Sequence, residues 1–316
     1  MRRATKPFDV LGLGAIAVDD LLYVGAYPPA DAKARVLRRE RHCGGLTATA
    51  LVAAARLGAR CAYAGVLGQD ELSDFVLGCL AREGIDVSKV QRRRFFGPVH
   101  SHIVVDKTRG TRNIFFNENG VQGAPSIPPR NLLCTSRVLF VDNVGVPGMV
   151  RAARLARRAG IPVVADFESN IHTQFHTLLA LADHLILSRH FAQALTGAPT
   201  VARALSGLDN GKREVWAVTD GTAGCWYQAR GWSSPKHHPA FKVAAVDTTG
   251  CGDVFHGAYA FALARGFPVE ERFRIAAAAA ALKAIKPGGQ AGCPTWPAVR
   301  RFLKMNAADG EPPLAE

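Results

Sequence analysis

The sequence lacks several features that would assign it to familiar classes of protein. It has no run of about 18 apolar residues, so we expect no membrane-spanning helix and no membrane partner. Its 7 cysteines are scattered, without a Cys-x-x-Cys pair, which argues against a disulfide framework and a cysteine-bound metal. Acidic residues are few, with 26 Asp and Glu against 39 Lys and Arg. We therefore expect a soluble, cytoplasmic protein with reduced thiols and a basic surface.

The formal net charge of +13 raises the question of a nucleic-acid partner. The basic clusters, at 38–41, 92–94 and 151–158, lie far apart in the sequence and contain no interleaved aromatic residues. Charge excess alone indicates neither a fold nor a specific ligand. We therefore expect no nucleic-acid partner and assign these clusters to solvated faces, whose field would also attract a small anion.

Strand-like and helix-like segments alternate along most of the chain, which predicts an α/β domain over residues 1–305 with a mostly parallel sheet between helices. Two β-rich regions, roughly 20–42 and 96–120, interrupt this alternation and predict a small separate sheet that contains a hairpin. Residues 306–316 are rich in Pro and Ala and predict a disordered tail. The predicted strands include Phe8–Leu13, Val138–Asp142, Ile161–Asp166, Leu185–Ser188, Val215–Thr219 and Val243–Asp247, and the predicted helices include Thr47–Leu57, Pro147–Ala159, Asp253–Arg265 and Val269–Ile285.

The strongest local motif is Asp247-Thr248-Thr249-Gly250-Cys251-Gly252-Asp253, between a predicted strand and a predicted helix. Glycines at a helix start allow backbone amides to face an anion at the positive end of the helix dipole. The motif is not a Walker A loop, because no Gly-Lys-Ser/Thr follows. Asp253 would then lie beside a phosphate in transfer and could accept a proton from the attacking hydroxyl. The alternative is an aspartate that only caps the helix.

Other candidate positions are weaker. Thr219, Gly221 and Gly224 form a turn after a strand that suits nucleotide phosphates, and Gly44-Gly45 would let a sugar approach the backbone, although both patterns are also ordinary turns. The pattern Gly12-Leu13-Gly14 imitates a dinucleotide fingerprint, but no helix pattern follows it. The two remaining candidates are acids, namely Asp19, whose carboxylate could accept sugar hydroxyls, and Asp166, at the end of a strand where ligands gather.

The pattern from Asp247 to Tyr259 resembles the C-terminal signature of the ribokinase-like (pfkB-type) carbohydrate kinases, and the stretch from Gly44 to Asp70 resembles the N-terminal one. The resemblance covers nearly the whole chain. It implies a Rossmann-type α/β sandwich with a small β-sheet lid over the sugar, ATP and Mg²⁺ as donor, and often a monovalent cation such as K⁺. Matched by position, it implies Asp253 as base, an anion hole of Gly250, Cys251 and Gly252, and sugar contacts from Asp19, Gly44 and Gly45, with Thr49 where a sugar-binding asparagine is usual. It places Thr219, Gly221, Gly224 and Ser188 at ATP, and Asp247 and Thr249 at the monovalent cation. Asp166, an acid at the end of a strand, is a candidate to hold magnesium-bound water.

Within that family, residues 48–58, 239–243 and 286–292 resemble the members that phosphorylate 6-deoxy-6-sulfofructose. Lys33 and Asn117 fall where those members contact the anionic substrate, and Asn143 stands where an anion-binding arginine is usual. The resemblance therefore implies a ketohexose or ketohexose derivative as acceptor: sulfofructose, a ketose phosphate or a related sugar. It also allows a homodimer that pairs through the lids.

Two alternatives remain open. Phe95, Phe96, Phe115 and Phe116 lie in the region of the predicted small sheet and could stack on a base, which keeps a nucleoside kinase possible. Ser188-Arg189-His190-Phe191 replaces the family's usual Asn-x-x-Glu, which would suit a catalytically weak sugar-binding regulator. The intact Gly-x-Gly-Asp of residues 250–253 favours an active kinase over the regulator.

Overall fold

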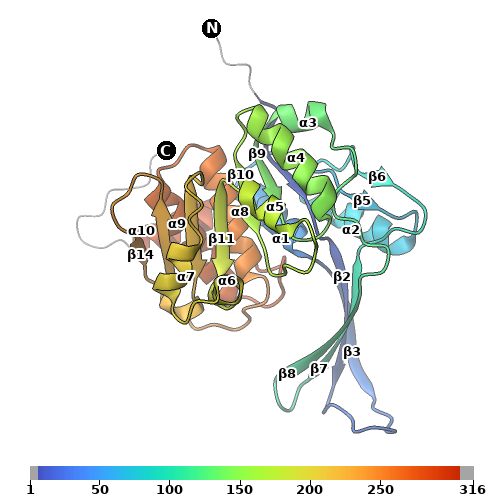
Figure 1. Cartoon of the computed structure of the whole chain (residues 1–316). Coiled ribbons are helices and arrows are strands. Elements are labelled where there is room, and N and C mark those ends of the chain that lie inside the picture. The colour runs from blue at the N-terminus through green and yellow to red at the C-terminus, as the bar shows by residue number, and fades with distance from the viewer. Residues whose placement is uncertain (1–5, 307–316) are drawn as a thin grey trace.

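The structure is a computed structural model that describes residues 6–306, so residues 307–316 of the predicted tail lie outside the described residues. An eight-stranded sheet lies between helices, and a four-stranded sheet projects from this body (Figure 1). Both sheets agree with the α/β class predicted from the sequence. Among the described residues, the helices are too short or too polar to cross a membrane.

The large sheet has the strand order β14-β13-β12-β11-β10-β9-β1-β4. The six strands from β12 to β4 run parallel to their neighbours, whereas β13 and β14 are antiparallel. The chain order changes direction at β1, whose two neighbours are β4 and β9, and ligands of such sheets bind at the carboxyl ends of strands near this point. The strands are β1 (Phe8–Leu13), β4 (Cys61–Tyr63), β9 (Ser136–Val141), β10 (Val163–Asp166), β11 (His184–Ser188), β12 (Val215–Thr219), β13 (Cys225–Ala229) and β14 (Lys236–His238).

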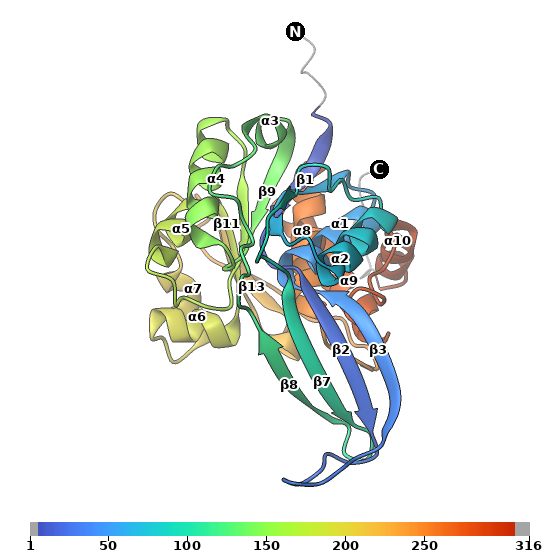
Figure 2. The same cartoon turned by 90° about the vertical axis from the view of Figure 1, so that its right-hand side faces the viewer.

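Alternate residues of the parallel strands fill two separate apolar cores. Val138 and Phe140 of β9 face one core, whereas Leu139 and Val141 face the other. The two cores are covered by different helices, which lie on opposite sides of the sheet (Figure 2). One side carries α1 (Leu46–Arg56), α2 (Glu71–Arg82), α8 (Cys251–Ala264), α9 (Val269–Ala284) and α10 (Trp296–Met305), and the other carries α3 (Arg130–Cys134), α4 (Val146–Arg158), α5 (Phe175–Leu181), α6 (Arg189–Thr196) and α7 (Val201–Gly207).

The projecting sheet, called the lid from here on, consists of β3 (Val36–Gly44), β2 (Ala17–Val24), β7 (Val99–Asp106) and β8 (Thr111–Asn117), in that order. Strands β7 and β8 form the predicted hairpin. Asp19 pairs with Ser101 and Ser101 pairs with Phe116, so these three side chains share one face of the lid. Pairing of two lids in a homodimer stays a prediction. The short strands β5 (Val66–Leu67) and β6 (Gln91–Arg92) form a third sheet.

One predicted strand is wrong. Residues 243–247 form an irregular segment, in which the backbone N–H groups of Val246 and Asp247 both donate to the carbonyl of Ala284 at the end of α9. The segment is thus hydrogen-bonded to a helix end. Its valines favour a strand only where a neighbouring strand is present to pair with. Gly12 and Gly14 serve packing, since an added Cβ would clash with Leu51 at Gly12 and with Asp142 at Gly14.

Candidate active site

The N-terminus of α8 presents backbone N–H groups to a ligand. Gly250 caps this helix with a left-handed φ of 77°, a conformation that favours glycine. A Cβ added to Gly252 would meet nothing within 4 Å, so the backbone is open at this position. The first N–H groups of a helix have no partner inside it, and the helix dipole adds partial positive charge. This end of α8 can therefore bind phosphate or another anion.

Asp253 lies in the first turn of α8, near two other acids. Burial, together with the carboxylates of Asp166 and Glu168, raises the pKa of Asp253 well above its usual range. Burial and Glu168 raise the pKa of Asp166 in the same way. His256, one turn further along α8, lies with Nδ1 at 3.2 Å from the Asp166 carboxylate. The cluster holds more acid than nearby base, which suits a proton acceptor and a bound cation.

Asp142 follows β9 and is fully buried, but its carboxylate is used within the protein. It accepts hydrogen bonds from the amides of Ala15 at 2.6 Å and Val144 at 2.7 Å, and from the hydroxyl of Thr47 at 2.7 Å. Burial raises the pKa of Asp142 to about 6. These bonds fix the ends of β1 and β9 against the start of α1, which positions the loops that surround the site.

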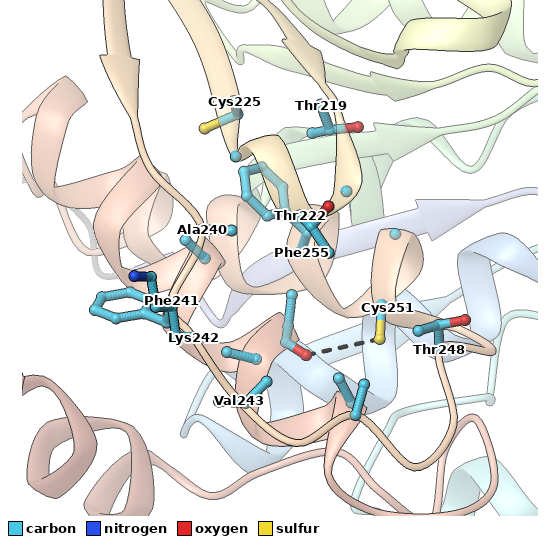
Figure 3. A pocket seen from close by; sticks show the side chains of 18 residues that line it. Thr219, Thr222, Cys225, Ala240, Phe241, Lys242, Val243, Thr248, Cys251 and Phe255 are labelled. Carbon is cyan, nitrogen blue, oxygen red and sulfur yellow. Dashed lines mark hydrogen bonds between the residues drawn. The ribbon is translucent and has the colours of Figure 1, made fainter.

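A cavity of about 480 Å³ adjoins the same end of α8. Thr219, Gly221 and Gly224, three predicted nucleotide contacts, line it together with Cys251 and Gly252 (Figure 3). The opposite walls are mostly apolar and come from residues 240–245, from Phe255 and from alanines of α9. Gly224 has a φ of 90°, which favours glycine, and an added Cβ would also clash with the carbonyl of His238. An apolar slot that ends in backbone amides and threonines suits a flat base with phosphates.

A second group of predicted residues meets at the base of the lid. The carboxylate of Asp19 accepts a hydrogen bond from Ser101, and burial raises its pKa. A Cβ on Gly44 would lie 2.5 Å from the Asp19 carboxylate, and a Cβ on Gly45 would lie 2.7 Å from the carbonyl of Ala15. Thr49 is buried in α1, where a Cβ on Gly250 would lie 3.5 Å from its methyl group. The glycines therefore allow the lid strand β3 to approach Asp19 closely, next to the start of α8.

The pattern of the pfkB family carbohydrate kinases matches residues 13–296. The chain belongs to this family. A ribokinase from Bacillus subtilis is 30% identical over 268 residues, which cover 82% of this chain and 87% of that protein. Two similar structures extend the comparison. A ribokinase of Arabidopsis thaliana, complexed with ribose and ATP, has a TM-score of 0.86 at 22% identity and covers 94% of this chain and 99% of its own. A protein assigned as ribokinase II from E. coli, in complex with ATP and Mg²⁺, has a TM-score of 0.81 at 20% identity and covers 95% of this chain and all of its own.

The comparison confirms the predicted fold and the predicted enzyme class, a carbohydrate kinase. In this kinase some predicted contacts already have partners within the chain. Ser188 caps α6 by accepting from the amide of Phe191 at 3.2 Å, and Asn143 accepts from the amide of Glu168 at 2.9 Å. Asn117 accepts from the amide of Asn119 at 2.9 Å, and Lys33 lies exposed between β2 and β3. Roles for these four residues in binding stay predictions.

Two basic residues that the sequence did not predict lie near the candidate site. Arg112, on lid strand β8, donates to the hydroxyl of Thr249 at 3.0 Å, just before α8. The ammonium group of Lys283, on α9, donates to the backbone carbonyl of Asp247 at 2.7 Å, within the predicted cation loop. Helical spacing places Lys283 on the same face as the buried Ala276 and Ala279, a signal that a lysine in an alanine-rich helix is buried. No comparable signal in the sequence marks Arg112.

Proposed function

We propose that this kinase transfers the γ-phosphate of ATP to a hydroxyl of a ketohexose or a ketohexose derivative, with Asp253 as the general base. The observation that carries the proposal is the position of the start of α8. Cys251 and Gly252 line the nucleotide-sized cavity, while Gly250 lies against Thr49, next to the Gly44-Gly45 turn and Asp19. Asp253 therefore lies where a donor in the cavity and an acceptor under the lid would meet.

The residues present fit ATP and magnesium. The apolar cavity suits adenine, and the similar Arabidopsis structure contains ATP and ribose. Asp166 and Glu168 would hold Mg²⁺ directly or through its water, since their mutual repulsion with Asp253 would be relieved by a cation. When bound, the ion would neutralise charge on the phosphates.

The remaining steps are carried out by the chain itself. Asp253 accepts the proton of the attacking hydroxyl. The backbone N–H of Gly252, at the open position of the helix start, faces the transferred phosphate and stabilises its charge. Asp19 accepts hydrogen bonds from sugar hydroxyls and so orients the acceptor. Closure of the lid excludes water, so the kinase should hydrolyse ATP slowly without sugar.

The test is ADP release with Mg-ATP across ketoses, ketose phosphates, 6-deoxy-6-sulfofructose, ribose, deoxyribose and nucleosides. On the best acceptor, Asp253→Asn should reduce kcat by roughly 10² to 10⁴, the range expected for loss of a general base. Asp209→Asn makes the same change at an exposed position and should retain parental activity. Unimpaired turnover by Asp253→Asn would refute the assignment of the base, and a clear preference for ribose would refute the ketohexose.

One observation favours nucleosides as a second class of acceptor. Phe116 is 65% exposed and shares the lid face that carries Asp19 and Ser101. An aromatic ring at this position could stack on a base, which a ketose does not have. If nucleosides are the better acceptors, Phe116→Ala should raise the KM for the nucleoside strongly; if a ketose is better, the same variant should affect its KM only slightly.

A further inference from the structure

The feature that the proposed function leaves unexplained is a buried cation. Lys283, near the end of α9, is 0% exposed. A Cβ on Gly292 would lie 3.2 Å from its Cε and 3.3 Å from its Cγ, so the following loop encloses the lysine stem. Lysines usually carry their charge to water along a flexible stem, and burial of an ammonium group is unfavourable unless acceptors surround it. The contacts of Lys283 should therefore indicate why the charge is retained.

The ammonium group joins two loops. It donates to the carbonyl of Asp247 at 2.7 Å and to the carbonyl of Lys286 at 3.4 Å, and it lies 3.8 Å from the Asp247 carboxylate. That carboxylate also accepts from the amides of Thr249 at 2.9 Å and Gly288 at 2.8 Å. The carbonyls of Asp247 and Lys286 and the carboxylate of Asp247 together form a group of oxygens, called the cradle from here on. Such oxygens only accept hydrogen bonds, so the cradle requires a donor or a cation at its centre.

The first of these loops leads directly into the anion-binding end of α8. The carbonyl of Thr248 accepts from the amide of Cys251 at 3.2 Å. The second loop touches the same place, because a Cβ on Gly250 would lie 3.2 Å from Cα of Gly289. Burial raises the pKa of the Cys251 thiol and the charge of Lys283 opposes this shift, as expected for a cation close to the first residue of α8. A substitution of Lys283 should therefore alter the position of the loop before α8 and the electrostatic potential at the anion hole.

The carbonyl and carboxylate cradle is what a monovalent cation such as K⁺ would also need, and Asp247 belongs to the loop that was expected to bind one. In this chain Nζ of Lys283 is already bound to the Asp247 carbonyl, so an ion would have to displace a buried lysine. The residues present therefore do not fit a monovalent ion in the same cradle.

We propose that Lys283 is a positioning residue that replaces a monovalent cation: its ammonium group fixes the Asp247–Gly250 loop and supplies a positive charge behind the anion hole. Phosphoryl transfer in this kinase accordingly needs no added K⁺. The inference rests on the proposed role of the α8 N-terminus, but its test includes a measurement that does not depend on catalysis.

The experiment compares the parent with Lys283→Ala, Lys283→Met and the control Lys304→Ala, which removes an exposed lysine. Each is assayed in choline chloride, with NaCl, KCl or NH4Cl added. The parent and the control should have the same kcat in every salt. Lys283→Ala should lose on the order of 10² in kcat, as for loss of one stabilising group at an anion hole, and K⁺ or NH4⁺ should restore much of it. Lys283→Met should lose a similar factor in kcat and should not recover in any salt, because the methionine side chain fills the space that an added cation would need.

Thermal unfolding of the same four proteins gives the second measurement. K⁺ or NH4⁺ should raise the Tm of Lys283→Ala more than Na⁺ does. In the parent, the control and Lys283→Met, the Tm should be the same in all three salts. Activation of the parent by K⁺, or an unchanged kcat in Lys283→Ala, would overturn the proposal. Loss of activity and of Tm without recovery in any cation would overturn it too, since Lys283 would then serve packing alone. If no acceptor is phosphorylated at all, the proposed function fails, while the Tm comparison still decides the role of Lys283.

Discussion

Arg112 offers a sharp test of how the lid takes part in catalysis. It lies on β8, on the lid face that also carries Asp19, and its guanidinium donates to the Thr249 hydroxyl at 3.0 Å. Thr249 immediately precedes the cap residue of α8. We therefore predict that Arg112 contacts the phosphate during transfer and that Arg112→Ala reduces kcat more than it raises KM.

Arg112 could either hold the lid closed or stabilise the phosphate in the transition state, and loss of these two roles would reduce kcat by different factors. Arg112 is exposed, so a bond that only holds the lid closed would contribute less than about 1 kcal/mol, or roughly fivefold. Removal of a donor that stabilises charge in the transition state costs about 10² to 10³ in kcat. A reduction in kcat of more than tenfold would therefore require contact with the reacting phosphate. Arg112→Lys keeps the charge but loses the planar fork, and should fall between the parent and Arg112→Ala.

The assay is steady-state ADP release on the best acceptor, with kcat and KM determined for the parent, Arg112→Ala, Thr249→Val and the double variant. If the bond to Thr249 were the whole contribution, the double variant would be no worse than Arg112→Ala. We expect Thr249→Val to lose much less kcat than Arg112→Ala. A raised KM with unchanged kcat in Arg112→Ala would refute a role in the transition state and leave Arg112 as a clamp of the lid.

Two further predictions concern stability. The pKa of Asp142, about 6 in the folded protein, lies above its ordinary value of 3.8, so its contribution is present below pH 4 and is lost as pH rises through 6. Relative to Asp142→Asn, the free energy of unfolding of the parent should fall by on the order of 3 kcal/mol between pH 4 and pH 7, as measured by urea titration; parallel pH curves would contradict this. Gly257→Ala would place a methyl group against the carbonyl of Ala50 in α1 and should destabilise the protein by about 1–3 kcal/mol. Gly252→Ala, where the added Cβ has open space, should unfold at nearly the parental Tm, and an equal loss in both variants would show that the clash with Ala50 is not the cause.

Much of the fold could be predicted from local pattern. The bounds of β1 and β12 agree with the predicted strands, and β7 and β8 lie within the region 96–120 where the hairpin was predicted. These segments are continuous apolar runs or alternating β-rich runs, where neighbouring residues carry the signal. The segment 243–247 failed because its pairing partner is the end of α9, far away in sequence. A pattern that depends on a distant partner cannot be recognised from its own residues.

The candidate site also contains some residues that a local sequence motif predicts and others that only distant contacts bring together. Gly250, Gly252 and Asp253 were recognisable because a turn, a helix start and an acid occur within seven residues of one another, from 247 to 253. Arg112 was not recognisable, because its proximity to Thr249 depends on how the lid lies over the body. Lys283 could have been found by counting along α9, but only the folded protein identifies Asp247 as its partner. Motifs thus predict the residues that we propose to act on the phosphate, and tertiary contacts identify residues that would support them.

The arrangement of charge explains why these supporting residues are needed. Asp253, Asp166 and Glu168 repel one another and would also repel the phosphates that the site must bind. The start of α8 offsets this only in part, since a helix end carries about half a unit charge. Lys283 lies behind the Asp247–Gly250 loop and Arg112 lies on its lid side, so positive charge reaches the loop from two elements. Lys283 belongs to α9 of the folded body, whereas Arg112 belongs to lid strand β8. The phosphate site should therefore bind nucleotide with the lid open and become strong enough to stabilise transfer only when the sugar has closed it.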